Sequence, residues 1–263
     1  MLGWRLFVRA LTLLIDNIGV ALRISALPYA LVVVASLWVV SSFGVEAMMG
    51  GPVGTDDPTA LSPTMPETTL VATGFLLSAL SVVVTLWIAV GWHRFVLLGE
   101  APRGILPAFH GGRVLAYLGW SLLIGLMVAL GLFAIIAVLG AVLAVLGLGA
   151  AGVILGPVAL FAAMVLFYRL SVKLPAVAVG RDLTFAQAWD ATKGHSGTVV
   201  LLAFLTVAFS LVIQIPTMLD MGAGSGTTAV TVVYQLVVQW VATLLGVGTL
   251  TALYGHLVEG RPV

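Results

Sequence analysis

Residues 114–168 read VLAYLGWSLLIGLMVALGLFAIIAVLGAVLAVLGLGAAGVILGPVALFAAMVLFY and contain no charged side chain. About 20 apolar residues suffice for one helix to cross the hydrocarbon core of a bilayer, so this stretch of about 55 residues is too long for a single crossing. Basic residues flank it on both sides, Arg113 before and Arg169 after, which predicts an even number of crossings. We therefore predict two helices, separated within the glycine-rich residues 140–152.

The composition of the whole chain also indicates a protein that spans a membrane. Of its 263 residues, 61% are hydrophobic and 8% are charged, with a mean hydropathy of +1.20. Soluble domains are about 45–50% apolar and about 25% charged, so this composition excludes a soluble domain and indicates an integral membrane protein. The chain has no Cys, which excludes disulfides and thiolate sites. No large basic cluster is present, so we expect no nucleic-acid partner.

Four further apolar stretches are long enough to span, which brings the predicted number of transmembrane helices to six. They lie at about residues 25–43, 70–92, 198–215 and 228–253. The N-terminal segment, about residues 3–20, has apolar residues interrupted by a narrow polar stripe that includes Arg9, Thr12 and Asp16. We predict that this segment is retained and lies along the membrane surface as an amphipathic helix.

The distribution of charge tests this model. With six crossings, all 11 Lys and Arg residues fall on one side of the membrane, whereas the other side carries only acids. The basic residues are Arg5, Arg9, Arg23, Arg94, Arg103, Arg113, Arg169, Lys173, Arg181, Lys193 and Arg261. Lys and Arg concentrate on the cytoplasmic side of membrane proteins. We therefore predict a bacterial inner-membrane protein with both termini in the cytoplasm.

An internal repeat is also suggested by the pattern. Three segments on the basic side are weakly amphipathic, end at a glycine-bearing break and precede a transmembrane helix: about residues 3–20, 102–112 and 182–194. In the third, Thr184 and Gln187 have the spacing of a capping box. The chain therefore reads as one membrane domain, 1–263, with three possible units of an interfacial helix and a helical hairpin, at 1–99, 100–181 and 182–263.

The most distinctive segment of the sequence is YRLSVKLPAVAVG at residues 168–180, followed by AWDATKG at 188–194. This stretch resembles a segment of uncharacterised bacterial six-helix inner-membrane proteins. That group is related to the membrane domain fused to some glycerophosphoryl diester phosphodiesterases. The resemblance implies membrane placement only. The phosphodiesterase domain itself is absent, and no catalytic residue is carried over.

The basic residues near helix ends are the first candidate site. Arg169 and Lys173 are one turn apart at the end of the fourth predicted helix, Arg94 ends the second, and Arg181 follows the fourth. Topogenic charge alone explains why these residues are basic. They are also suited to hold an anionic lipid headgroup or to contact an acidic partner protein, and the two interpretations are compatible.

Polar residues within the predicted spans are the second candidate. Gln235 and Gln239 lie one turn apart on the sixth helix, and Gln214 lies before Pro216 near the outer end of the fifth. They are suited to line a polar path, but interhelical hydrogen bonding is the favoured interpretation. Ionisable residues near the bilayer midplane, which ion-driven transporters usually need, are absent from the predicted spans.

One motif has the form of a catalytic site. Gly194-His195-Ser196-Gly197 matches the GxSG pattern of rhomboid intramembrane proteases, and His256 lies on the last helix. Both groups are expected near helix ends, and the His-x-x-x-Asn signature is missing, so a helix start is the favoured interpretation. The histidines lack an i, i+4 pair, so we predict neither a metal nor a cofactor.

The sequence thus predicts an all-α, polytopic membrane protein with six transmembrane helices. The function it favours is non-enzymatic: a lipid-interacting or partner-binding accessory module of an envelope process. A transporter for a small neutral or amphipathic solute is the first alternative, and an intramembrane enzyme is the second.

Overall fold

The computed structural model describes residues 1–43, 67–102, 104, 107–148, 152–222 and 229–263. Within these residues the secondary structure is helical and no strand is present. The helices are α1 (Leu2–Asp16), α2 (Ile18–Phe43), α4 (Glu67–Leu98), α5 (Gly111–Val145), α6 (Gly152–Ser171), α7 (Lys173–Val179), α8 (Phe185–Lys193), α9 (Ser196–Gly222) and α10 (Ala229–Leu257).

Six segments are long and apolar enough to cross a membrane: Ile18–Val39, Val71–Leu98, Gly111–Val145, Ile154–Val179, Ser196–Leu219 and Val233–Leu257. The protein is therefore an all-helical, multi-pass membrane protein, as the composition predicts. The long apolar stretch does divide into two helices. α5 ends at Val145, Gly147 adopts a φ of +69°, and α6 begins at Gly152.

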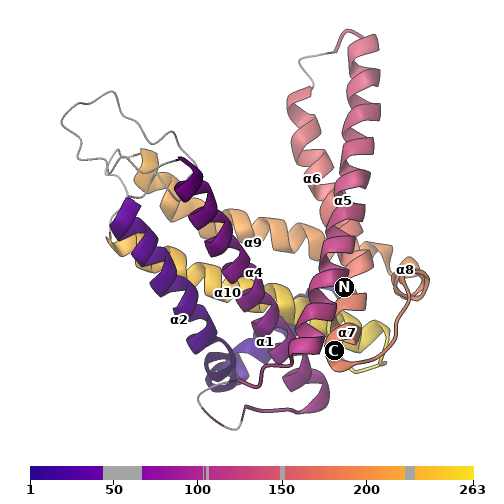
Figure 1. The fold of residues 1–263 in the computed structure, drawn as a ribbon. Coiled ribbons are helices and arrows are strands. Elements are labelled where there is room, and N and C mark those ends of the chain that lie inside the picture. Colours follow the sequence, from indigo (N-terminus) through magenta and orange to yellow (C-terminus); the bar gives the residue numbers. More distant parts are fainter. Residues whose placement is uncertain (44–66, 103, 105–106, 149–151, 223–228) are drawn as a thin grey trace, which may run out of the picture.

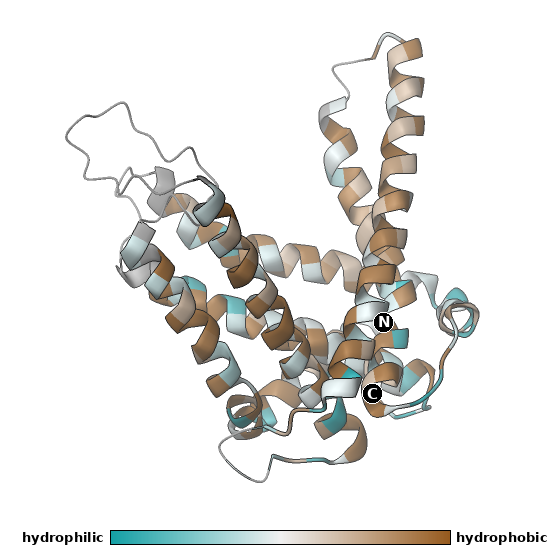
Figure 2. Cartoon of the chain, viewed as in Figure 1, coloured by the Kyte–Doolittle hydropathy of each residue, from teal (hydrophilic) through white to brown (hydrophobic). Residues whose placement is uncertain are grey.

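The spans share one common end (Figure 1). Both termini, α1, α7 and α8 lie there, whereas α5 and α6 project from it as a separate hairpin and α2 and α4 lean to the other side. Hydrophilic residues gather around this end, and the projecting helices are largely hydrophobic (Figure 2). We call it the basic end, because Arg94, Arg169, Lys173, Arg181 and Arg261 lie on the helix ends that meet there.

Left-handed glycines follow three of the helices that return to the basic end. Gly99 follows α4 with a φ of +73°, Gly180 follows α7 with a φ of +80°, and Gly260 lies after α10 with a φ of +69°. Only glycine adopts this conformation without steric strain, which explains why α4 and α7 end directly before Gly99 and Gly180, whereas α10 ends at Leu257, three residues before Gly260. The similarity of the three sequences around these glycines therefore corresponds to a similar backbone geometry.

The buried core lies at the basic end. One cluster includes Ile24, Trp92, Tyr117 and Leu244, and a second includes Leu6, Tyr168, Leu202 and Tyr254. The α5–α6 hairpin, by contrast, exposes most of its apolar side chains, as expected for a surface that faces lipid rather than water. α5 has 35 residues and is about 50 Å long, so it exceeds the ~30 Å hydrocarbon core unless it tilts.

α1 is separate from the first span, because Asn17 interrupts the helix before α2 begins. The Asn17 amide donates a hydrogen bond to Leu13 O at 2.9 Å, which caps the end of α1. One face of α1 is buried against α9 and α10, and Arg5 and Arg9 lie exposed on the other. The placement of α1 at the membrane surface stays a prediction.

The predicted second interfacial helix, about residues 102–112, is wrong. The described residues from 102 to 110 are not helical, and α5 begins only at Gly111. Pro107 lacks a backbone donor and disfavours helix in the residue before it, and Gly104 has low helix propensity. Residues 107–110 instead contact α4, where the Trp87 indole donates to Ala108 O at 3.3 Å.

Candidate functional site

The three helices that return to the basic end interlock through arginine side chains. Arg94 of α4 donates to Ala178 O at the end of α7, at 3.1 Å. Arg261, after α10, donates to Val96 O at 3.1 Å and to Leu97 O at 2.8 Å, at the end of α4. The last carbonyls of a helix have no partner within it and carry partial negative charge, so guanidinium groups stabilise these ends.

Arg94 is also neutralised by a carboxylate. Its Nε and Nη2 atoms donate to the two carboxylate oxygens of Glu100, at 2.8 and 2.6 Å. This bidentate contact lowers the pKa of Glu100 below its ordinary value of 4.5. Arg94, one of the predicted contact residues, therefore has its charge paired within the protein and joins α4 to α7.

Arg181 is paired in a similar way. Its guanidinium donates to Glu259, which also accepts a hydrogen bond from Arg261 Nε at 2.6 Å. The Glu259 side chain is only 8% exposed, so two arginines enclose it. Of the two arginine side chains, that of Arg181 is the more exposed, and it shares the single negative charge of Glu259 with Arg261.

Lys173 contacts Phe185 of α8, one turn before the Trp189 ring that Arg169 contacts, but its ammonium is buried rather than exposed at the surface. α6 ends at Ser171 and α7 begins at Lys173, because the ring of Pro175 would clash with the carbonyl four residues earlier in a continuous helix. Lys173 is only 6% exposed and donates to Leu183 O. Its ammonium lies 3.7 Å from the ring centroid of Trp120 and 5.4 Å from that of Phe185, so it serves as an internal cation–π contact.

Arg169 differs from these residues. Its Nη2 atom donates to Ser196 Oγ at 2.8 Å, and its guanidinium carbon lies 4.8 Å from the ring centroid of Trp189. Among the described residues, no carboxylate forms an ion pair with it. Of the four predicted basic contact residues, Arg169 is therefore the one that is neither buried nor paired with a carboxylate among the described residues.

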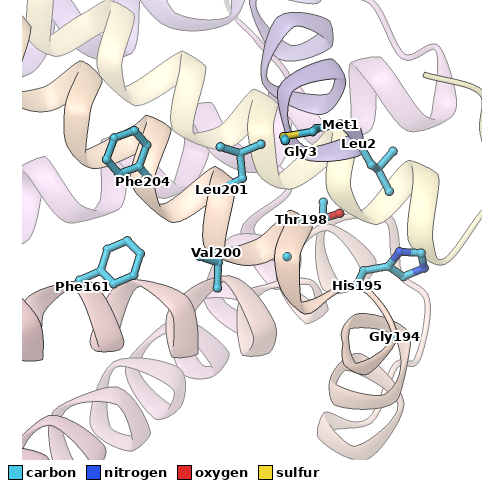
Figure 3. Close-up of a pocket in the computed structure, with 11 residues that line it drawn as sticks. Met1, Leu2, Gly3, Phe161, Gly194, His195, Thr198, Val200, Leu201 and Phe204 are labelled. Carbon is cyan, nitrogen blue, oxygen red and sulfur yellow. The ribbon is translucent and has the colours of Figure 1, made fainter.

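An apolar cavity of about 620 Å³ adjoins this corner, between α1, α6 and α9. Phe161 of α6 and Phe204 of α9 face each other at one side of it, and His195 lies at the other side (Figure 3). No Asp or Glu is among the residues that line it. The cavity is thus mainly apolar, and its polar side, at His195, adjoins Ser196 and the Arg169 that contacts it.

The polar residues of the spans do not converge. Gln235 of α10 donates to Thr217 of α9, which is the interhelical hydrogen bond that the packing interpretation predicts. Gln214 and Gln239 are exposed on the surfaces of α9 and α10. The geometry favours packing over a polar path, and transport stays an alternative without a structural observation in its favour.

A buried polar cluster joins three spans, and sequence reasoning missed it. His93 of α4 is fully buried, with Nδ1 at 2.8 Å from Thr251 Oγ1 of α10 and Nε2 at 3.2 Å from the Tyr117 hydroxyl of α5. His93 is not among the candidate residues that the sequence predicts. The three residues are far apart in the chain, so no local spacing signals their contact.

The GxSG residues do not form a serine–histidine dyad. Ser196 Oγ accepts from Arg169 and donates to Lys193 O at 3.1 Å, as a residue at a helix start does. His256 Nδ1 lies 2.8 Å from the carbonyl oxygen of Arg261 and forms a hydrogen bond with it at the end of α10. Within the described residues, no three His, Asp or Glu side chains gather as metal ligands.

The fold and this site define a multi-pass, α-helical membrane protein with an interlocked basic end. No family model matches the chain, and no curated protein or solved structure is detectably similar to it. The resemblance of residues 168–194 to uncharacterised six-helix membrane proteins therefore stays a prediction.

Proposed function

We propose that this protein is a non-enzymatic membrane module that retains anionic phospholipid at its basic end, as an accessory component of an envelope process in a bacterial inner membrane. The observation that carries the proposal is Arg169. Its guanidinium lies at the end of a membrane-spanning helix, stacks on the half-exposed Trp189, and has no carboxylate partner among the described residues.

The distribution of paired and unpaired charge supports this choice. Arg94 is paired with Glu100, and Arg181 and Arg261 share Glu259. Arg5 and Arg9 on α1 and Lys193 at the end of α8 are exposed, and none of them forms an ion pair within the described residues. α1 and α8 both pack on α9, so these three exposed basic side chains lie on elements that contact the helix that begins at Ser196.

Trp189 supports the assignment of a membrane-surface depth. Tryptophan concentrates at the level of lipid headgroups, where its ring lies in an apolar environment and its N–H group reaches water. Arg169 stacked on this ring presents its remaining N–H donors at the same level. A phosphodiester oxygen is the acceptor that guanidinium groups bind best in that environment.

The test compares Arg169→Gln with Arg23→Gln, an exposed arginine on α2 that serves as the matched control for net charge. Each protein is reconstituted in nanodiscs with equal phosphatidylglycerol and phosphatidylethanolamine, and the lipids that stay bound after transfer to detergent are quantified by mass spectrometry. Because one charge near an anionic surface contributes about 1 kcal/mol, the anionic-to-zwitterionic ratio should fall about fivefold in Arg169→Gln.

The control should retain the ratio of the unmodified protein. An equal ratio in all three proteins would contradict the proposal and would leave Arg169 with a topogenic role only. Lys173 is not used in this test, because its ammonium is buried and its replacement would disturb the contact with Trp120.

A further inference from the structure

We infer that the cavity between α1, α6 and α9 holds one acyl chain of an anionic membrane phospholipid, whose phosphate is bound by Arg169. The inference rests on the proposed function and adds a defined site to it. Its first support is the size and lining of the cavity. About 620 Å³ lies within the range of small-molecule sites, and the walls are formed mainly by apolar side chains such as Leu2, Leu201 and Phe204.

The depth of the cavity matches one leaflet of a bilayer. Phe161 precedes Arg169 by eight residues on α6, which places it about 12 Å further from the basic end. Phe204 follows Ser196 by eight residues on α9, and therefore lies at about the same depth. One leaflet contributes about half of the ~30 Å hydrocarbon core, so an acyl chain attached to a headgroup at Arg169 reaches both phenylalanines.

The charge of the rim selects the class of lipid. No acidic side chain lines the cavity, and His195 lies at the side opposite Phe161 and Phe204 (Figure 3). Arg169 is joined to Ser196, the residue after His195, and Lys193 lies exposed just before them. A peptide would leave backbone polar groups unpaired against the phenylalanine walls, whereas a phospholipid has an apolar chain for the walls and an anion for the rim.

Glycines keep the cavity open. A Cβ atom at Gly194 or Gly197 would have no neighbour within 4 Å, so both positions border free space. At Gly3, by contrast, a Cβ atom would lie 2.9 Å from Thr198 O, so α1 rests directly on the backbone of α9 and closes one side. Gly197 also lines the cavity, so a large side chain there has room to occupy it without displacing the backbone around it.

The experiment uses phosphatidylglycerol that carries a diazirine in the middle of its acyl chain. It is added at low fraction to vesicles of equal phosphatidylglycerol and phosphatidylethanolamine that contain the full-length protein. After photolysis, cross-linked residues are mapped by peptide mass spectrometry. Cross-links should concentrate at Phe161 and Phe204 and should fall at least about fivefold in Gly197→Phe.

Gly119→Phe is the matched control, because Gly119 is exposed on α5 and a Cβ atom there also meets open space. Val200→Trp is a second variant that fills the cavity from its wall, and Val212→Trp is its control on the same helix. Cross-links at Phe161 and Phe204 should persist in both controls and decrease in both cavity variants.

The outcomes separate this inference from the proposed function. If Arg169→Gln lowers the anionic lipid ratio but Gly197→Phe and Val200→Trp leave the cross-links unchanged, the cavity assignment is overturned and the proposed function stands. If the cavity variants remove the cross-links while Arg169→Gln leaves the ratio unchanged, the cavity binds a chain but the anionic selectivity is overturned. Cross-links spread evenly over exposed helix faces in the unmodified protein overturn the cavity assignment, whatever else occupies the site.

Discussion

At the residue scale, the direction of the hydrogen bonds around the buried His93 follows from its partners. The Thr251 hydroxyl donates to Val247 O at 2.8 Å within α10, so its oxygen is free to accept from His93 Nδ1. The imidazole then carries its proton on Nδ1, and Nε2 accepts from the Tyr117 hydroxyl. Every polar atom of this imidazole is thereby satisfied where no water is expected, and three spans are joined.

This assignment predicts a sign reversal in a pair of substitutions. Tyr117→Phe alone leaves His93 Nε2 buried without a donor, which should lower the free energy of unfolding by about 1–3 kcal/mol. In a His93→Phe background the Tyr117 hydroxyl is already unpaired, so adding Tyr117→Phe should restore part of the lost stability. Thermal unfolding of the four proteins in one detergent measures the coupling. Equal losses from Tyr117→Phe in both backgrounds would show that the two side chains do not interact.

At the element scale, the length of the apolar runs was enough to place all six spans. The flanking charges of residues 114–168 correctly required two helices there, because a third crossing would carry basic residues to the opposite side. The capping box is also confirmed, because the backbone N–H of Gln187 donates to Thr184 Oγ1 at 3.2 Å. These features depend on local sequence, so local reasoning finds them.

The candidate site was less predictable, because pairing between distant segments decides which charges remain free. Arg181 and Glu259 meet although 78 residues separate them, and neither position indicates the other. The inward turn of Lys173 depends on the break before Pro175 and on Trp120 from another helix. Charge and spacing alone therefore identified four basic candidates, and the fold distinguishes Arg169 among them.

The contact between α1 and α9 yields a prediction for these elements. A Cβ atom at Gly3 would lie 2.9 Å from Thr198 O and 3.1 Å from the Leu201 Cβ, so Gly3→Ala should force α1 away from α9. Overpacking of this kind costs about 1–3 kcal/mol, and hydrogen exchange of the α1 amides should accelerate about tenfold or more. Gly19→Ala on α2 is the control, because a Cβ atom there meets open space. Unchanged exchange in Gly3→Ala would show that α1 is not docked through this face.

At the scale of the whole molecule, the interlocking contacts form a closed cycle. The end of α4 contacts that of α7 through Arg94, α7 is linked to α10 through Arg181 and Glu259, and α10 returns to α4 through Arg261. In addition, α1 packs on α10, residues 107–110 contact α4, and α8 packs on α6. Three repeated hairpins would produce this arrangement, and the repeat of 1–99, 100–181 and 182–263 stays a prediction.

The same cycle makes a prediction of topology that does not depend on the distribution of charge. Since the ends of α4, α7 and α10 touch one another, the three hairpins must return to the same side of the membrane, and α1 and α8 lie on that side as well.

The chain has no cysteine, so single cysteines can be placed at Thr12, Lys193 and Thr68 without background labelling. In inside-out vesicles from a bacterial host, a membrane-impermeant maleimide should label the first two and not the third. In vesicles of the opposite orientation it should label only Thr68, which begins the second span at the far end of α4. Labelling of Thr68 and Lys193 from one side would require an even number of crossings between them, whereas three spans separate them, and would contradict both the interlocked ends and the cytoplasmic placement of the basic end.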